Sequence, residues 1–178
     1  QIDDEVYVYG SYVQSKMFHK GIRCVDCHDP HTVKLHTYTN QLCTRCHVPN
    51  EDNPTGFDSA DHHFHEVGTK GAQCVECHMP HKTYMGIDER RDHSIRIPRP
   101  DHTLRFGTPN ACNQCHTDQS ADWAYSALVD WGVRFADRRS HPARAFHAAG
   151  RGDVRAAPVL LETANNATNT PMLRASAI

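Results

Sequence analysis

The sequence has little of the apolar material from which protein cores are normally built. Leu, Ile, Val and Phe together make up 31 of its 178 residues, about 17%, which is below the ~20% at which chains usually lack enough apolar surface to fold. A disordered chain of this kind normally also carries a high net charge. Here 19 basic and 21 acidic residues give a formal net charge of −2. The core therefore needs a contribution from something other than ordinary side chains.

Further absences narrow the class of protein. No run of 18 apolar residues occurs, so we predict no transmembrane segment. The pI is near 6.8 and there is no long basic run, which argues against nucleic-acid binding. The chain begins at Gln1 without an initiator Met or an apolar leader. We therefore expect a mature protein from which a targeting segment has been removed.

Cysteine and histidine are abundant, with 8 and 15 copies, and every cysteine belongs to one of four C-x-x-C-H motifs. This pattern is the attachment signature of haem c. Cysteines three residues apart lie on one face of a helical turn, so both can attach to one edge of a porphyrin while the next histidine binds the iron. The sequence predicts four haem c groups. The motif residues are Cys24, Cys27 and His28; Cys43, Cys46 and His47; Cys74, Cys77 and His78; and Cys112, Cys115 and His116.

Paired cysteines also occur in zinc sites, redox dithiols and disulfide frameworks. Zinc gives no reason for a histidine after every pair, and a thioredoxin-like site needs a βαβ pattern that this sequence lacks. Cysteines at i and i+3 are also unsuited to cross-linking distant loops. The four identical histidine positions therefore favour haem over these three alternatives.

Surplus histidines predict a second imidazole ligand for each iron. Nine histidines outside the motifs precede His116, more than four sixth positions require. A methionine ligand, from Met17, Met79 or Met85, is the alternative. The predicted distal ligands are His19, His31, His65 and His93, and the reserves are His62, His63, His81 and His102.

An internal repeat supports the choice of His19, His31 and His65. Phe-His precedes the first and third motifs, and Pro-His follows both of them. The repeat makes His19 equivalent to His65, and His31 equivalent to His81. The chain is therefore predicted to contain two dihaem modules in tandem.

The predicted fold is mostly irregular and α-helical. We expect short helices at the motifs, long loops wrapped round the haems, and a small C-terminal α-helical segment. The predicted regions are a tetrahaem domain over residues 1–118, with modules at about 18–50 and 64–118, and an α-helical tail over 119–178. Residues 1–17 are expected to form an extended arm, as an edge strand, and residues 95–100 are also expected to be extended.

The tail contains four helix-start signals. They are Ser120, Ser140 with Pro142, Asp153, and Thr170 with Pro171. The first helix is expected to pack through Trp123, Ala127, Leu128 and Trp131, which recur at helical spacing. Short helices of this kind resemble the opening of a helical-repeat array. Whether the chain continues past Ile178 is open.

Arginines gather between the third and fourth motifs. Arginine suits bidentate binding of carboxylates, so we expect this cluster to contact haem propionates, with a solvated basic loop as the alternative. The five are Arg90, Arg91, Arg96, Arg99 and Arg105.

The stretch from about Glu5 to Val133 resembles bacterial multihaem, and specifically tetrahaem, c-type cytochromes with doubled C-x-x-C-H motifs and a C-terminal helical-repeat-like tail. The phrases that carry the resemblance are VYVYGSYVQSKMFHKGIRCVDCHDPH, AQCVECHMPHKTYM, RRDHSIRIPRP and GTPNACNQCHTD. The resemblance implies export, extracytoplasmic haem attachment and electron transfer. Filament-forming extracellular cytochromes are a related group.

These observations predict an electron-transfer protein rather than an enzyme, with no catalytic residues. It would act as a periplasmic or extracellular relay, exchanging electrons with redox partner proteins or an extracellular acceptor. A soluble shuttle and a homopolymeric conducting filament are both open. The alternative is a multihaem oxidoreductase, or its electron-donating subunit, acting on a small nitrogen or sulfur compound. That chemistry needs an iron with an open distal position.

Overall fold

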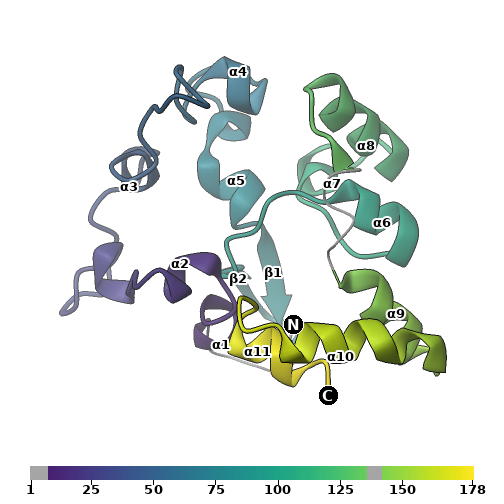
Figure 1. Cartoon of the computed structure of the whole chain (residues 1–178). Coiled ribbons are helices and arrows are strands. Elements are labelled where there is room, and N and C mark those ends of the chain that lie inside the picture. The colour runs from purple at the N-terminus through teal and green to yellow at the C-terminus, as the bar shows by residue number, and fades with distance from the viewer. Residues whose placement is uncertain (1–7, 136–141) are drawn as a thin grey trace. The chain divides into compact units, whose positions relative to one another are not determined.

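A computed structural model describes residues 8–135 and 142–178 of the chain (Figure 1). Contacts divide the chain into two units, Gln1–Pro98 and Arg99–Ile178. This division places the fourth motif with the C-terminal helices, whereas the sequence suggests a boundary after residue 118. The boundary between a haem-binding region and a tail, and the two tandem modules, stay predictions.

The first unit consists of short helical turns and long loops, with one small sheet. Figure 1 shows how little regular structure lies between α2 and α4. Two strands pair as an antiparallel hairpin, in a register that sets His81 opposite Arg91. The elements are α1 (Tyr9–Tyr12), α2 (Lys16–His19), η1 (Cys24–Asp26), α3 (Gln41–Thr44), α4 (Ala60–His63), η2 (Lys70–Ala72), α5 (Cys74–His78), β1 (His81–Tyr84) and β2 (Asp88–Arg91).

The second unit is helical throughout its described part. Helix α8 packs against α6 and α7, and α10 packs against α9 and α11. The elements are α6 (Pro100–Phe106), α7 (Cys112–Cys115), α8 (Ala121–Asp130), α9 (Ala143–Gly150), η4 (Val154–Ala156), α10 (Ala157–Asn165) and α11 (Pro171–Ala175). The predicted fold class, short helices and loops with a small C-terminal helical segment, is confirmed.

Most helix starts in the tail are confirmed. Side-chain oxygens of Ser120, Asp153 and Thr170 each accept a hydrogen bond from a backbone N–H two or three residues later, which satisfies donors that have no partner inside the helix. Helix α9 follows Pro142 directly, and Ser140 lies outside the described residues. The predicted packing face of α8 is partly wrong.

The buried face of α8 is formed by Ala124 and Leu128, whereas Trp123 is 37% exposed. Ala124 and Leu128 are four residues apart and lie on one face of the helix. Trp123 lies outside that face, and its ring packs instead against the motif histidine His116, with the ring centres 4.7 Å apart. The helical spacing in the sequence did not distinguish the residues buried on the packing face of α8 from Trp123, which packs against His116.

The extended arm predicted for residues 1–17 is wrong where the structure describes it. Residues 9–12 form α1, and residues 16–19 form α2. The buried Tyr12 donates its hydroxyl to the Ile22 carbonyl at 2.7 Å, and Ser15 caps α2 by accepting from Phe18 N. These contacts favour helical turns over the extended form suggested by the alternating Val and Tyr residues. Residues 1–7 of the arm lie outside the described residues.

The hairpin of β1 and β2 was not predicted. Three residues, Met85, Gly86 and Ile87, connect the strands, because the register pairs Tyr84 with Asp88. Met85 and Gly86 have φ values of 51° and 76° and form the left-handed centre of a turn in which Ile87 N donates to the Tyr84 carbonyl. Asn-Gly is the usual signal for such a turn, and Met-Gly is not. The extended segment predicted for residues 95–100 is also wrong at its ends, because Ile95 has a φ of 45° and Pro100 begins α6.

Few apolar side chains are buried in either unit. In the described part of the first unit they are Tyr12, Ala72 and Tyr84, and in the second five of the seven are alanines. Burial of large apolar side chains is the main favourable term in folding. The side chains alone therefore leave the first unit with almost no core. No helix in the described residues is long and apolar enough to cross a membrane.

We predict that Leu128→Ala lowers the free energy of unfolding of the second unit by about 2–5 kcal/mol, because it leaves a cavity among buried side chains. Leu128 is 7% exposed, whereas its neighbour Val129 is 44% exposed. Val129→Ala is therefore the matched control, with an expected loss below about 1 kcal/mol. Thermal unfolding followed by far-ultraviolet circular dichroism measures both. Equal losses in the two variants would contradict the packing of α8.

A second prediction concerns pH. Burial by itself would raise the pKa of the Asp101 carboxyl, but the hydrogen bonds and charge of Arg99 outweigh burial and hold that pKa below its usual value. The Arg99 Nε and Nη2 atoms both donate to the carboxylate at 2.7 Å. A depressed carboxyl pKa stabilises the fold above the unfolded-state pKa, and this contribution is lost as the pH falls through the folded-state value.

We therefore expect Asp101→Asn to destabilise the second unit at pH 7 by about 1.5–3 kcal/mol, the range for hydrogen bonds to charged groups. The difference from the wild type should shrink as the pH falls below the ordinary carboxyl pKa of 3.8. Denaturant titrations at several pH values measure it. Asp130→Asn, at an exposed position on α8, is the control and should show no such convergence.

Candidate haem-binding site

Each C-x-x-C-H motif forms one helical turn, as its spacing predicts. The backbone N–H of the motif histidine donates to the carbonyl of the first cysteine in the first, second and fourth motifs, at 2.8, 3.0 and 2.9 Å. The third motif is helix α5 itself. None of the eight cysteines forms a disulfide bond. The turns thus place both thiols of each motif beside one another and next to their histidine.

Among the described residues of the first unit, two pairs of histidine rings lie opposite each other with nearly parallel planes, and each pair contains one motif histidine. His28 of the first motif faces His93, with ring centres 6.4 Å apart and an angle of 23° between the rings. His78 of the third motif faces His62, with ring centres 6.3 Å apart and an angle of 8°. His93 is a predicted distal ligand, and His62 is a reserve.

The spacing of both pairs fits one metal ion bound between two imidazoles. A first-row metal binds an imidazole nitrogen at about 2 Å, and the ring centre lies roughly 1 Å behind that nitrogen, so two opposed rings on one ion have centres about 6 Å apart. Rings in direct face-to-face contact would be much closer, because carbon atoms in contact lie about 3.5–4 Å apart. The separation of the ring centres therefore agrees with an iron that would be bound by one nitrogen from each ring.

The hydrogen bonds of the His28, His78 and His93 rings leave Nε2 available to bind a metal. A metal-bound histidine usually donates its other ring N–H to a carbonyl or carboxylate. His28 Nδ1 bonds to the Val33 carbonyl at 2.7 Å, His78 Nδ1 to Arg96 O at 3.0 Å, and His93 Nδ1 to Arg91 O at 2.9 Å. A carbonyl can only accept, so Nδ1 carries the proton and Nε2 keeps its lone pair for a metal.

Burial keeps the rings in the form that can bind a metal. It lowers the pKa of His62, His78 and His93, and the charge of the facing motif histidine adds to this at His62 and His93. A hydrogen bond to a backbone carbonyl opposes the shift at His78 and His93. A lowered pKa favours the neutral imidazole, which is the form that coordinates metals.

His65, another predicted distal ligand, shares this hydrogen-bond pattern. Its Nδ1 donates to the His63 carbonyl at 2.5 Å. A Cβ atom on residue 71 would lie 2.3 Å from the Cδ2 atom of His65, so the Gly71 position keeps space for this ring. Both contacts fix the orientation of the His65 ring.

The other predicted distal ligands are placed differently. The His19 ring uses Nε2 to contact the Val13 carbonyl at 2.9 Å, and a donor to a carbonyl cannot at the same time bind a metal. The His31 side chain is exposed. Its backbone N–H donates to Asp29 Oδ1 at 3.1 Å. The structure therefore does not bring His19 or His31 to face a motif histidine within the described residues of the first unit.

The three remaining reserve ligands, His63, His81 and His102, differ in the partners of their ring nitrogens. The Nε2 atom of His63 is buried and has no hydrogen-bond partner in the described residues, and its Nδ1 accepts from His65 N at 3.2 Å. His81 Nδ1 lies 3.8 Å from Glu89 Oε1 on the hairpin. His102 Nε2 lies 3.9 Å from Asp101 Oδ2 on α6.

Among the described residues, the ring that packs against the second motif histidine, His47, belongs to a phenylalanine and not to a histidine. The Phe57 ring packs edge-on against His47, with centres 5.8 Å apart, and also against His62, with centres 5.2 Å apart. Phe57 thus links the second motif to the histidine pair of the third. Nothing in the sequence pattern had singled out Phe57.

The second and third motifs also meet at their cysteine ends. Asn40, three residues before Cys43, accepts a hydrogen bond from Cys74 N at 3.0 Å and donates to the Ala72 carbonyl at 2.9 Å. The thiols of Cys43 and Cys74 are hydrogen-bonded to each other, which lowers the pKa of Cys43 to about 7 and raises that of Cys74.

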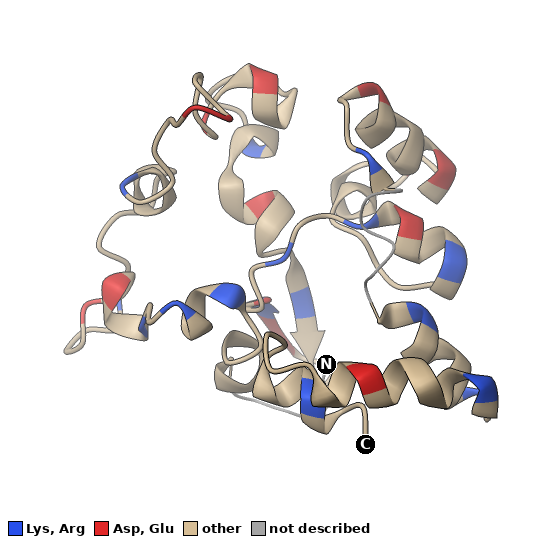
Figure 2. Cartoon of the chain, in the orientation of Figure 1, with Lys and Arg blue, Asp and Glu red and all other residues tan. Residues whose placement is uncertain are grey.

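Three of the five arginines between the third and fourth motifs, Arg90, Arg91 and Arg99, pair with protein carboxylates. Figure 2 shows basic and acidic positions interspersed along the ribbon of each unit. Arg90 pairs with Asp88, and Arg99 pairs with Asp101. Arg91 Nη2 contacts Glu76 Oε1 at 2.5 Å, and its Nη1 donates to the Val75 carbonyl inside the third motif and the Met79 carbonyl just after it, at 3.2 and 3.1 Å. Contact with haem propionates stays a prediction.

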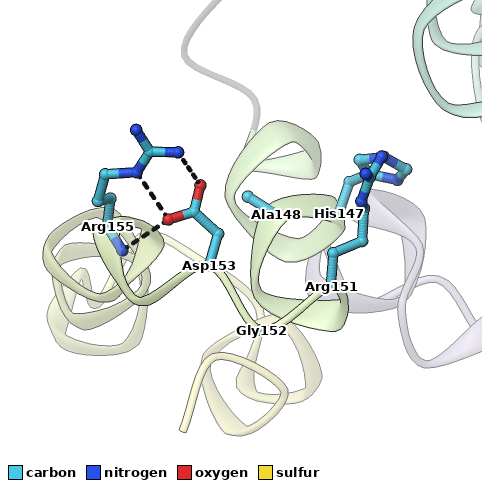
Figure 3. A pocket seen from close by; sticks show the side chains of 6 residues that line it. All are labelled: His147, Ala148, Arg151, Gly152, Asp153 and Arg155. Carbon is cyan, nitrogen blue, oxygen red and sulfur yellow. Dashed lines mark hydrogen bonds and ion pairs between the residues drawn. The ribbon is translucent and has the colours of Figure 1, made fainter.

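A hollow of about 490 Å³ in the second unit lies apart from these residues (Figure 3). In it Arg155 Nε and Nη2 donate to the Asp153 carboxylate at 2.8 and 2.9 Å, and His147 and Arg151 lie on the other side. None of the predicted haem-binding residues lines it. The arrangement is an ion pair on an open surface and is not part of the candidate site.

We predict that Arg91→Ala lowers the free energy of unfolding of the first unit by about 2 kcal/mol, because it removes hydrogen bonds to a charged group and leaves Glu76 without its closest cation. Arg90→Ala is the matched control. Its partner Asp88 is 41% exposed, and exposed ion pairs contribute at most about 1 kcal/mol. Denaturant unfolding measures both. A larger loss from Arg90→Ala would contradict the role of Arg91.

No family model matches this chain, and no curated protein matches it. Among solved structures, the chain is similar to the crystal structure of the outer cell wall cytochrome OcwA. The likeness has a TM-score of 0.47 and 16% sequence identity, and it covers 98% of this chain and 47% of the other. The chain thus spans about half the length of that cytochrome.

Proposed function

We propose that this chain transfers electrons through four covalently attached haem c groups. The single observation that carries the proposal is that two pairs of imidazoles lie at metal-bridging spacing, His28 with His93 and His62 with His78. Each pair joins one C-x-x-C-H histidine to one histidine from elsewhere in the chain. A side-chain core so small supports the same conclusion, because four porphyrins would supply the missing apolar volume.

The roles of the chain's residues follow from their positions. The eight motif cysteines would form the thioether links, and the four motif histidines would provide one axial ligand each. His93 would complete the first site and His62 the third. Bound haem iron supplies one-electron chemistry, and two imidazole ligands leave no position open for a substrate. The backbone carbonyls that accept from Nδ1 would keep the rings oriented.

The second and fourth sites are assigned less directly. His65 is proposed as a distal ligand because its Nδ1 is held by a carbonyl and its ring has space beside Gly71. His19 and His31 stay candidates only if their rings turn from the positions described. In this proposal His62 takes a place that the sequence repeat gave to one of them.

The cellular setting is proposed from the motifs and the resemblance. Covalent haem attachment at C-x-x-C-H and the resemblance to multihaem c-type cytochromes support a periplasmic or extracellular location. The partners would be redox proteins or an extracellular electron acceptor. A homopolymeric filament and a soluble relay both agree with these residues.

A second candidate function has one observation in its favour. In the described residues of the first unit Phe57, and no imidazole, packs beside the second motif histidine His47. A haem held there without a sixth ligand could bind a small nitrogen or sulfur compound, as an oxidoreductase requires. Electron paramagnetic resonance of the oxidised protein separates the two functions. Low-spin iron throughout supports electron transfer, and a high-spin signal supports the enzyme.

The ligand assignment is tested by His93→Ala and His62→Ala in the haem-loaded protein. Each variant should retain four haems by intact mass, convert one low-spin haem to high-spin, and gain one carbon monoxide site when reduced. His36→Ala is the matched control, because His36 Nε2 is used by the Val25 carbonyl at 2.9 Å. Unchanged spectra in both test variants would reject the assignment. A wild-type mass without covalent haem would reject the proposed function.

A further inference from the structure

We propose that Asn40 holds the second and third haem-attachment sites side by side, so that the two haems act as one coupled redox pair. The inference rests on the proposed function, because it requires haem at both motifs. It adds a spatial order that the sequence does not contain. In the tandem-module prediction the second and third motifs belong to different modules.

Asn40 joins three separate segments through one side chain. Its Nδ2 donates to Asp58 Oδ1 at 2.6 Å and to the Ala72 carbonyl at 2.9 Å, and its Oδ1 accepts from Cys74 N at 3.0 Å. An amide can donate and accept at once, which neither Asp nor Leu could do here. The N-terminal ends of the second and third motif turns are therefore tied to the same residue.

The first cysteines of the two motifs meet at this point. The Cys43 and Cys74 side chains are in hydrogen-bond contact. When each is bonded to its haem, the two attached porphyrin edges start from neighbouring sulfur atoms. The contact exists because Asn40 fixes the start of one motif turn against the start of the other.

The histidine ends of the two motifs are linked independently. Phe57 packs edge-on against His47 at 5.8 Å and against His62 at 5.2 Å, and the His62 ring faces His78. The two motifs thus approach one another both where the haems attach and where the irons bind. Contacts at both ends restrict the orientation of the second motif relative to the third. A single contact would allow one motif to rotate about it.

The fourth motif shows that an asparagine before a motif does not have this role in general. Asn110 lies two residues before Cys112 and also makes three side-chain hydrogen bonds. Its partners are Thr103 and Asn113, the latter as acceptor and as donor. These all belong to the segment round the fourth motif. Asn110 therefore provides a control of the same residue type and hydrogen-bond number.

Close sites interact through charge. Adding an electron to one centre makes the next addition to its neighbour less favourable, and the effect grows as the separation and the local dielectric constant fall. Such coupling is reciprocal. The wild-type pair should therefore titrate with mutually dependent potentials, whereas separated haems would titrate independently.

The test uses the haem-loaded protein, Asn40→Ala and Asn110→Ala. Proton nuclear magnetic resonance should show a cross-peak in the wild type between the haem protons next to the Cys43 and Cys74 thioethers. A redox titration of the same signals should show each haem shifting as the other is reduced. Asn40→Ala should lose the cross-peak and the mutual shift while keeping four haems and their low-spin ligands. Asn110→Ala should retain both.

The outcomes are distinguishable. Absence of covalent haem in the wild type overturns the proposed function. Four haems without the cross-peak or the mutual shift overturn only this inference, as does an Asn40→Ala variant that retains both. If Asn40→Ala does not load haem, Asn40→Asp replaces it. This variant keeps the acceptor for Cys74 N and sets a carboxylate against Asp58, so the same loss is expected and its absence rejects the role of Asn40.

Discussion

Imidazole rings fixed by backbone carbonyls are the interaction on which the first unit of this chain depends. Its described residues bury only Tyr12, Ala72 and Tyr84 among apolar side chains. Packing of that extent cannot hold loops in place, and local hydrogen bonds in turns add little on their own. Histidine pairs connect segments far apart in the sequence. His28 and His93 face each other although they are separated by more than half of the unit. A metal between them would act as a cross-link.

The hydrogen bonds of the rings distinguish histidines that can bind a metal through Nε2 from histidines that cannot, a difference that the sequence does not show. A ring that donates Nδ1–H to a carbonyl keeps Nε2 for a metal, as at His28, His78 and His93. A ring whose Nε2 contacts a carbonyl does not, as at His19 and His36. The carbonyl partners come from loop backbone whose position no side-chain pattern encodes. His19 and His65, which the sequence repeat made equivalent, therefore differ in the ring nitrogen that is bonded to a carbonyl.

Local chemistry predicted the elements whose signals lie within a few residues. The motif turns, the caps at Ser120, Asp153 and Thr170, and the predominance of short helices needed only i to i+4 relations. The hairpin was missed because Met85 and Gly86 lack the usual turn residues. The N-terminal arm was misjudged because the contact of Tyr12 with Ile22 outweighs an alternating pattern of only a few residues.

The sequence by itself indicated the chemistry, since four C-x-x-C-H motifs and surplus histidine predict haem binding without any knowledge of the fold. Only the tertiary structure decided which histidines face one another and which motifs lie together. Asn40 contacts Cys74, and His28 faces His93, across loops that have no regular period. Side-chain spacing along the chain specifies neighbours within one turn or strand. Contacts between distant loops depend on where each backbone donor and acceptor finds its partner.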